Sequence, residues 1–442
     1  MSDRNSWDYL DLDNFDEGID SRDYRRRYPD RKRNSSYGVR PTYDRRPRSR
    51  RRRRNRRRTR NRIIMVTVPL LILVLLITLI AAIVNGCNNR TEPTVISTDT
   101  KPPVAATEAP SVPSTTVPAT QPVNSGDKLS ITNFIAPQPS DNHSAGYESG
   151  AIYVWNGAGY ELFGADEESG RYYAETVNNL ADKLSGMNVY SMIVPNHTEM
   201  GLPARFSSEV YTASQANNIK AAYAAMDTTK VKPINAYNYL SEHCNEYIYF
   251  KSDHHWTGLG AYYAYAAFAD TLGIPKLPLE NCTEQTIEGF TGSFSNMAQL
   301  ETDTVHYWQF PYAATMDITE DDGNQVQFES PYYEAEESGP NSYGVFIFGD
   351  NAITVLRSSS SDAQKGKRIA VIKESYGNAF VPYLTNNYEE VHVLDMRSFR
   401  KASSDNFVTY CQNNKITDVL FLNGVMSANA QTLLDSMTAM FN

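Results

Sequence analysis

The chain has 442 residues, with 42 Lys and Arg against 51 Asp and Glu, and a formal net charge of −9 at pH 7. Residues 1–62 hold 22 of the basic and 10 of the acidic side chains, so this segment carries +12 and the remainder carries −21. This division excludes a uniform globular protein. The acidic remainder also argues against nucleic acid as the partner of the main domain, because its own charge repels phosphate.

The first segment, residues 1–62, is rich in Arg, Asp, Tyr and Ser and has almost no aliphatic side chains. It cannot offset its ordering entropy by burial, so we expect a disordered cytoplasmic tail. The basic run at 45–62 suits anionic lipid head groups, and a basic residue near such a surface contributes about 1 kcal/mol. Nucleic-acid binding by this run is an alternative, but a role in lipid binding or membrane orientation is favoured.

An uncharged apolar run follows at residues 63–84. As a helix its 22 residues would be about 33 Å long, enough to cross a hydrocarbon core of about 30 Å. Basic residues are concentrated before it, which predicts a single-pass plasma-membrane protein with its N-terminus inside and residues 86–442 outside. A signal peptide fits badly because the run is long and begins late in the chain. A lipoprotein cleavage site at Asn85-Gly86-Cys87 is a further alternative.

Residues 85–129 are dominated by Pro, Thr, Ser, Ala and Val without a helical or strand period. This composition predicts a stiff extracellular linker of polyproline type. Residues 130–442 are then long enough for one large extracellular domain with insertions. The four cysteines form no CxxC pair, which excludes a dense disulfide framework and leaves a single bridge, such as Cys244 to Cys282, open.

In this domain, short apolar runs alternate with helical patterns. Strands are predicted at 189–194, 343–348, 368–372, 391–394 and 418–422. Helices are predicted at 171–184, 213–226, 260–272, 378–386 and 428–440. Such alternation favours an α/β domain with a mainly parallel sheet. The region 275–362 is less regular, and we interpret it as an insertion or an edge β segment.

The first group of candidate catalytic residues is the motif Lys251-Ser-Asp-His-His-Trp-Thr257, which lies just before the helix predicted at 260–272. An aspartate two residues from a histidine can accept a hydrogen bond from the imidazole, fix its tautomer and stabilise the imidazolium. The alternative is a structural Asp–His pair ahead of a helix whose N-cap is Thr257. Zinc binding by Asp253, His254 and His255 is a weaker alternative, because ligands in an adjacent pair rarely converge on one ion and no further ligand has motif spacing. We therefore expect neither a metal nor another cofactor.

The second group of candidate catalytic residues lies in the segment Arg368-Ile-Ala-Val-Ile-Lys-Glu-Ser375-Tyr-Gly-Asn378. An apolar strand ends, a serine follows within three residues, and a helix begins near Asn378. Hydrolytic α/β enzymes expose a nucleophilic serine at such a turn, where backbone N–H groups also stabilise an oxyanion. A helix-capping serine is the commoner alternative for this motif taken alone.

Together these two motifs resemble the DHHW protein family, which belongs with the AlgX/AlgJ-type SGNH-hydrolase-like O-acetyltransferase domains. The resemblance extends through VYSMIVPNHTEMGLP at 189–203 and GFTGSFSN at 289–296. It covers most of residues 145–442 and none of the tail, span or linker. It implies an SGNH-like α/β/α sandwich with insertions, in which the Asp/His motif precedes the serine.

Carried over residue by residue, the resemblance implies three catalytic roles. Ser375 matches the nucleophile, His255 the general base, and Asp253 the carboxylate that orients it. His254, between the two motif residues, is expected to face elsewhere. Glu374 stands where family members commonly have Asp, which keeps the charge but adds a methylene.

The resemblance also implies secondary sites. The turn at Tyr376, Gly377 and Asn378 matches a position that helps to hold the oxyanion or the substrate. Arg397 matches a recurrent basic position that would contact an anionic or sugar substrate. A multi-pass membrane acyltransferase that supplies the acyl group is the implied partner.

The resulting expectation is a membrane-anchored Ser-His-Asp enzyme that O-acetylates a cell-envelope polysaccharide or a cell-wall glycan. An esterase that removes acetyl groups from the same glycans is one alternative. A non-catalytic glycan-binding protein of the cell wall is another, although a binding module has no need of Asp253, His255 and Ser375 together.

Overall fold

The computed structural model describes residues 128–333 and 342–442. The predicted tail (1–62), the predicted membrane span (63–84) and the predicted linker (85–129) up to residue 127 lie outside the described residues. Within the described ranges, every helix is too short or too polar to cross a membrane.

The domain is built on one mixed eight-stranded sheet with the strand order β5-β4-β13-β11-β12-β10-β8-β9. The strands from β5 to β12 in this order pair in parallel, and β10, β8 and β9 continue the sheet in antiparallel fashion. The strands are β4 (Asn188–Val194), β5 (Val231–Pro233), β8 (Ala314–Thr319), β9 (Gln325–Phe328), β10 (Ile353–Ser358), β11 (Gln364–Lys373), β12 (Tyr388–Asp395) and β13 (Asp418–Gly424).

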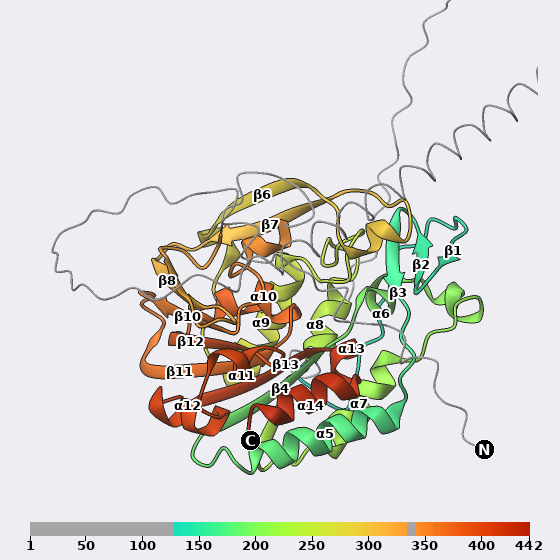
Figure 1. The fold of residues 1–442 in the computed structure, drawn as a ribbon. Helices are drawn as coiled ribbons and strands as arrows, with labels where there is room; N and C mark the ends of the chain where they lie inside the picture. The colour runs from blue at the N-terminus through green and yellow to red at the C-terminus, as the bar shows by residue number, and fades with distance from the viewer. Residues whose placement is uncertain (1–127, 334–341) are drawn as a thin grey trace, which may run out of the picture. The chain divides into compact units, whose positions relative to one another are not determined.

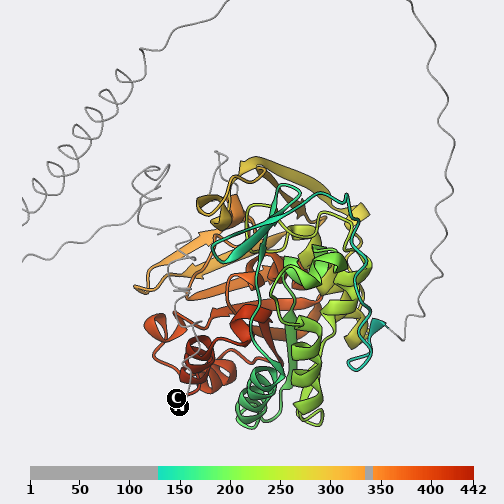
Figure 2. The same cartoon turned by 90° about the vertical axis from the view of Figure 1, so that its right-hand side faces the viewer.

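Helices cover both faces of this sheet (Figures 1 and 2). In Figure 1, α8, α9 and α10 lie on one side, and α5, α12 and α14 lie on the other. The helices are α5 (Glu167–Ala181), α6 (His197–Gly201), α7 (Gln215–Ala225), α8 (Ala236–Glu242), α9 (Gly258–Leu272), α10 (Tyr376–Leu384), α11 (Phe399–Ala402), α12 (Phe407–Asn413), α13 (Val425–Ala428) and α14 (Gln431–Ala439). Between helices and sheet lies the main apolar core.

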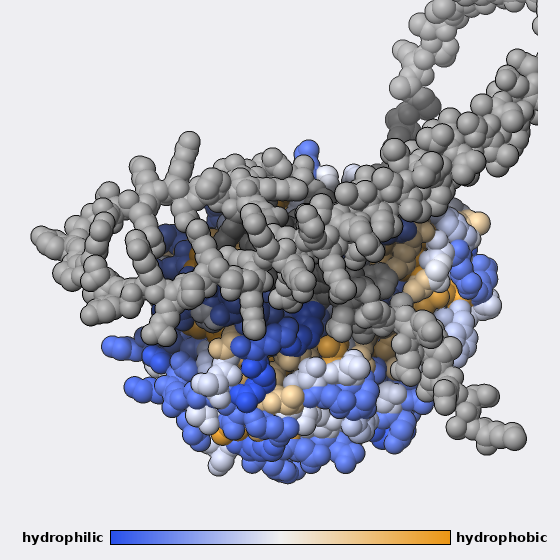
Figure 3. Space-filling view, in the orientation of Figure 1, coloured by the Kyte–Doolittle hydropathy of each residue, from blue (hydrophilic) through white to orange (hydrophobic). Residues whose placement is uncertain are grey.

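The sequence explains this layering. Every residue of β13 is buried, as expected for a central strand covered on both faces. In α5 one apolar stripe faces the sheet, and the hydroxyl of Tyr173 lies 3.1 Å from both Ser191 Oγ and Asn423 Oδ1. The outer side of α5 and α14, in the lower part of Figure 3, is mainly hydrophilic.

Two smaller sheets flank the main one. Strands β1 (Tyr147–Ser149), β2 (Ile152–Trp155) and β3 (Ala158–Glu161) form an antiparallel meander, and β6 (Thr283–Phe290) pairs with β7 (Asp303–Gln309). The backbone N–H of Gly159 in β3 donates to the carbonyl of Lys251 at 2.8 Å. The 3₁₀ turn η3 (Ser293–Asn296) bonds through the Phe294 N–H to Ser252 at 2.9 Å. Both contacts fix the loop that carries the Asp/His motif.

Most sequence predictions for this domain are confirmed within a few residues. The helices predicted at 171–184, 213–226, 260–272, 378–386 and 428–440 correspond to α5, α7, α9, α10 and α14. The irregular region 275–362 holds β6 to β10, of which β8, β9 and β10 form the predicted edge of the sheet.

The strand predicted at 343–348 is wrong. This segment begins as the 3₁₀ turn η4 (Ser342–Val345), and Ile347 and Phe348 have positive φ angles of 49° and 58°. An apolar run of this length does not distinguish a strand from any other fully buried segment.

The disulfide that the sequence left open, Cys244 to Cys282, is not formed. Within the described residues Cys244, Cys282 and the buried Cys411 are all free.

Candidate active site

The carboxyl ends of neighbouring parallel strands converge on one region. Ser375 follows the end of β11, Gly424 ends β13, Asp395 ends β12, and Asn196 follows β4. Ligand sites of open parallel sheets lie at this edge, where loops from adjacent strands meet. The loop 251–257, which leads into α9, supplies the Asp/His motif to the same place.

Three side chains form a continuous hydrogen-bonded relay there. Ser375 Oγ lies 2.7 Å from His255 Nε2, and His255 Nδ1 lies 2.5 Å from Asp253 Oδ1. All three residues are almost fully buried. With the imidazole proton on Nδ1, Nε2 is free to accept the serine proton, which is the arrangement of a nucleophile, a base and an orienting carboxylate.

Two further bonds lock the Asp/His motif onto the serine turn. The indole N–H of Trp256 donates to the carbonyl of Tyr376 at 2.9 Å, and the Tyr376 hydroxyl donates to the carbonyl of His254 at 2.5 Å. Thr257 caps α9 by accepting from the Gly260 N–H at 3.3 Å. The predicted N-cap is therefore present together with the Asp253–His255 hydrogen bond. The two motifs, about 120 residues apart, are therefore one unit in space.

Asp253 is placed as an ionised carboxylate. Its Oδ1 also accepts the backbone N–H of His255 at 3.0 Å, and its Oδ2 accepts that of Ser293 at 2.8 Å. Burial alone raises the pKa of this carboxyl, but the attraction of His254 and His255 and these hydrogen bonds hold the pKa well below its ordinary value. Asp253 is therefore equipped to stabilise an imidazolium.

Gly292 packs directly against Asp253. A Cβ at this position would lie 2.2 Å from the Asp253 Cβ and 2.4 Å from Oδ2, so a larger residue must displace the carboxylate. We expect Gly292→Ala to slow the labelling of Ser375 by a fluorophosphonate by about 10- to 100-fold, because a misplacement of about 1 Å has effects of that size. Ser295→Ala, an exposed position in the same turn, is the control. Equal labelling rates in the two variants would contradict this role of Gly292.

His254 does not face away from the site, as the resemblance had implied. Its ring centroid lies 3.8 Å from that of His255, and its Nδ1 lies 2.9 Å from Ser293 Oγ. The reason is the backbone of the short loop, which is fixed by the Tyr376 hydroxyl bond to the His254 carbonyl. His254 thus covers the ring of the base.

Asp253, His254 and His255 each offer a ligand atom, and these atoms lie within 4.8 Å of one another. Two ligands of one zinc ion, each about 2 Å from the metal, lie more than about 3 Å apart. The separation of 2.5 Å between His255 Nδ1 and Asp253 Oδ1 is shorter than that and fits a hydrogen bond. The three residues therefore fit the relay better than a metal ion.

The serine turn does not offer the oxyanion donors that the sequence implied. The Tyr376 N–H donates to Glu374 Oε2 at 3.0 Å, the Gly377 N–H to the Glu374 carbonyl at 2.9 Å, and the Asn378 N–H to the Ser375 carbonyl at 3.1 Å. Among the described residues the backbone N–H of Ser375 itself has no acceptor. It lies at the N-terminus of α10, where the helix dipole favours negative charge.

Glu374 explains why those donors are occupied. Its second oxygen, Oε1, accepts the N–H of Gly424 at 2.7 Å, so its carboxylate ties the serine turn to the end of β13. Burial raises the pKa of this carboxyl, and the two N–H bonds oppose the effect. The longer side chain of Glu374 thus bridges from the end of β11 to the backbone at the end of the neighbouring strand β13.

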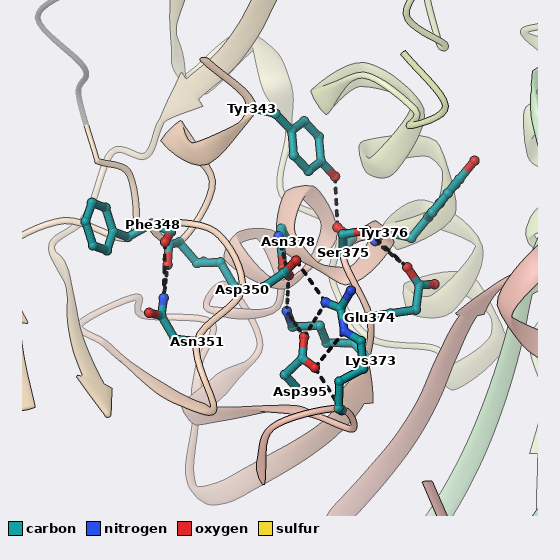
Figure 4. Close-up of polar contacts among 12 residues, drawn as sticks. Tyr343, Phe348, Asp350, Asn351, Lys373, Glu374, Ser375, Tyr376, Asn378 and Asp395 are labelled. Carbon is teal, nitrogen blue, oxygen red and sulfur yellow. Dashed lines mark hydrogen bonds and ion pairs between the residues drawn. The ribbon is translucent and has the colours of Figure 1, made fainter. Parts of the chain in front are cut away.

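Arg397 belongs to a partly buried charge cluster with Lys373, Asp350 and Asp395. Figure 4 shows the last three beside the serine turn. Its guanidinium pairs with Asp395 at 2.7 Å and with Asp350 at 2.8 Å. Lys373, fully buried, donates to the same two carboxylates at 2.7 Å from Asp350 and 3.0 Å from Asp395. The amide of Asn378 donates to Asp350 at 2.9 Å. The side chains of Asn378 and Arg397 therefore bind the carboxylates of this cluster. Contact between Arg397 and an anionic or sugar substrate stays a prediction.

Sequence reasoning missed several residues of the site. Tyr343 stacks on His255, Ser293 caps Asp253, Gly424 holds Glu374, and Asp350 completes the charge cluster. Ser293 lies in the GFTGSFSN segment that carries the family resemblance. The resemblance therefore marked this segment but implied no role for Ser293. The others are distant in sequence from both motifs and have no local pattern.

Comparisons with known proteins identify the family of this chain and solved structures with a similar fold. A family model described as DHHW protein matches residues 129–394. The crystal structure of a DHHW family protein from Eubacterium siraeum is 29% identical, covers 69% of this chain and 98% of its own, and has a TM-score of 0.59. The structure of Bacillus cereus PatB1 is 22% identical over 65% of this chain and 98% of its own, with a TM-score of 0.53, and PatB1 has also been solved with a sulfonyl adduct.

The O-acetyltransferase domain of Pseudomonas putida AlgJ also matches, at 12% identity and a TM-score of 0.35, over 63% of this chain and 93% of its own. No curated protein matches this chain.

Proposed function

Because this chain belongs to the DHHW protein family, as its sequence predicted, we propose that it is an acyl-transfer enzyme whose nucleophile is Ser375. The observation that carries the proposal is the continuous relay from Ser375 Oγ through His255 to Asp253, at 2.7 and 2.5 Å. The α/β fold that places a serine at the end of β11 supports it.

The proposed reaction begins when the Ser375 hydroxyl gives its proton to His255 Nε2 and attacks the carbonyl carbon of an acyl ester. Asp253 stabilises the imidazolium that forms. The Ser375 N–H at the start of α10 donates to the oxyanion of the tetrahedral intermediate. His255 then returns the proton to the leaving alcohol, and the acyl group stays on Ser375 as an ester.

In the second half the acyl group leaves Ser375. An acceptor hydroxyl gives its proton to His255 Nε2 and attacks the acyl-enzyme, and the proton returns to Ser375 Oγ as the new ester departs. A sugar hydroxyl as acceptor gives an O-acylated glycan, and water gives hydrolysis. We propose the glycan, in keeping with the family resemblance, and an acetyl group as the cargo.

We also propose the setting that the sequence predicts. The 63–84 run anchors the protein in the plasma membrane, and residues 85–129 carry the enzyme into the cell envelope. A multi-pass membrane acyltransferase supplies the acyl group, and an envelope polysaccharide or cell-wall glycan receives it. Each of these statements rests on sequence composition and on the family resemblance.

Product analysis tests the proposal. The purified full chain is incubated with para-nitrophenyl acetate and chitotetraose, and the products are separated by mass. Acetylated oligosaccharide formed by the native protein and absent with Ser375→Ala is the expected result. Free acetate alone, still dependent on Ser375, would indicate an esterase. Neither product from a folded protein would contradict an acyl-transfer role with this donor.

A further inference from the structure

The imidazole of His255 lies between two aromatic rings. The Tyr343 ring is stacked on it, with centroids 4.1 Å and planes 13° apart, and the His254 ring centroid lies 3.8 Å away. Separations this short place each ring over a face of the imidazole, and two rings cannot share one face. The base is therefore held from both sides.

Tyr343 also contacts the residue that carries the nucleophile. Its hydroxyl donates to the carbonyl of Ser375 at 3.0 Å (Figure 4). One side chain thus packs on the base with its ring and bonds the serine backbone with its hydroxyl. A shift of Tyr343 would change the position of His255 Nε2 relative to Ser375 Oγ.

The backbone that follows Tyr343 is strained. Ile347, Phe348 and Gly349 have consecutive φ angles of 49°, 58° and 77°. The left-handed region is unfavourable for a β-branched residue, so this conformation has an energetic cost. The amide of Asn351 offsets part of this cost by donating to the carbonyls of Ile347 and Phe348 at 3.3 and 3.2 Å. Strain of this kind persists where the surrounding structure fixes it, which is commonly at functional sites.

The far end of the 343–351 segment is anchored on the same serine turn. Asp350 accepts from Lys373 at 2.7 Å and from Asn378 at 2.9 Å. Figure 4 shows Tyr343 on one side of Ser375 and Asp350 on the other. The segment therefore spans the nucleophile turn and bonds it at both ends.

We propose that Tyr343 is a positioning residue for the acyl-transfer reaction: its stacked ring holds the imidazole of His255, and its hydroxyl bond to the Ser375 carbonyl is a secondary anchor of the tyrosine itself. The 343–351 segment fixes that tyrosine through its second anchor at Asp350. This inference rests on the proposed function, because positioning matters only if Ser375 reacts. When Tyr343 is shortened, the imidazole gains rotational freedom and Nε2 loses its fixed direction toward Ser375.

The test measures how fast phenylmethanesulfonyl fluoride modifies Ser375 in the full chain, followed by intact mass. This reagent needs an activated serine and no knowledge of the natural acyl donor. We expect Tyr343→Phe, which keeps the stacked ring, to react within about 3-fold of the native rate, and Tyr343→Leu to react about 30-fold or more slowly. With para-nitrophenyl acetate the loss in Tyr343→Leu should appear in kcat, with KM little changed.

Tyr383 provides a matched control. It is buried, and its hydroxyl donates to the carbonyl of Gly258 at 2.9 Å, but it is not stacked on His255. Tyr383→Leu therefore measures what a lost buried ring and a lost hydrogen bond do by themselves, and melting temperatures show whether each variant folds.

The outcomes separate the two claims. A folded Tyr343→Leu that reacts at the native rate would overturn the positioning role, as would an equal loss in Tyr383→Leu. A native protein that the reagent does not modify would instead contradict the proposed function. Slow labelling confined to Tyr343→Leu, with Tyr343→Phe close to native, would support the proposal.

Discussion

Replacing Asp253 by asparagine is expected to lower kcat/KM for an aryl acetate by about four orders of magnitude, while the protein stays folded. The amide nitrogen of asparagine would face either His255 Nδ1 or the N–H groups that the carboxylate now accepts. In the first case the imidazole takes the wrong tautomer, with its proton on Nε2, and can no longer accept the serine proton. In the second case two donors oppose each other in a buried site.

Asp303 offers a matched control for this substitution. It is also buried, and its carboxylate accepts the backbone N–H groups of Lys251 and Ser252, at 2.9 and 2.7 Å, in the same loop. It does not contact His255. Asp303→Asn should therefore lower stability and leave kcat/KM within about tenfold of native. Similar losses of kcat/KM in both variants would mean that Asp253 only supports the loop.

Replacing Lys373 by methionine is expected to destabilise the fold by about 3–5 kcal/mol. The side chain is fully buried, and its ammonium lies between Asp350 and Asp395. Without the Lys373 ammonium, Asp350 and Asp395 share only the Arg397 guanidinium. One cation then faces two carboxylates, and the negative charge of the buried Asp395 is poorly compensated. Urea unfolding of the purified chain, followed by tryptophan fluorescence, measures the loss. Lys365→Met, at an exposed position on the same strand, should change stability by less than about 0.5 kcal/mol.

The same cluster sets a pH dependence. Burial raises the pKa of Asp350 and of Asp395, but the nearby cations outweigh it, so both pKa values lie below the ordinary value. Burial lowers the pKa of Lys373, and the two carboxylates outweigh that effect and raise it. Stability from the aspartates is therefore present above their unfolded pKa of about 3.9 and lost as pH falls further. Stability from Lys373 is present below about pH 10.4 and lost as pH rises through its folded pKa.

Acid unfolding checks this reasoning. The native protein should lose stability below about pH 4, where the two aspartates bind protons in the unfolded chain but stay ionised in the folded one. In Lys373→Met the aspartates lose their main cation, so their folded pKa values rise and the loss on acidification is smaller. Parallel stability–pH curves for the two proteins would contradict this account of the cluster.

The sequence was informative where function depends on local order. Asp253 and His255 are two residues apart, so one short loop presents both, and Ser375 follows an apolar strand that could be read directly. Helices α5, α7, α9, α10 and α14 follow from their periodicity, whereas the shorter α8 and α12 were not predicted. For the parallel strands β4, β11, β12 and β13, the apolar runs were sufficient, because each is buried on both faces.

Long-range contacts were not predictable in this way. Tyr343 reaches His255 only because the 343–351 segment leaves the strand conformation that its apolar residues suggested. The N–H of Gly424 meets Glu374 across two strands whose pairing the sequence does not specify. Arg397 lies two residues from Asp395, a spacing that allows their ion pair, but its second partner, Asp350, is 47 residues away and has no local signal.

The most direct test of the central claim is the detection of an acyl group on Ser375. The full chain is mixed with para-nitrophenyl acetate, quenched with acid within one turnover, and measured by intact mass and peptide mapping. We predict an added mass of about 42 Da, one acetyl group, on the peptide that contains Ser375, and none in Ser375→Ala. An adduct on another residue, or turnover that persists in Ser375→Ala, would contradict the assignment of Ser375 as the nucleophile.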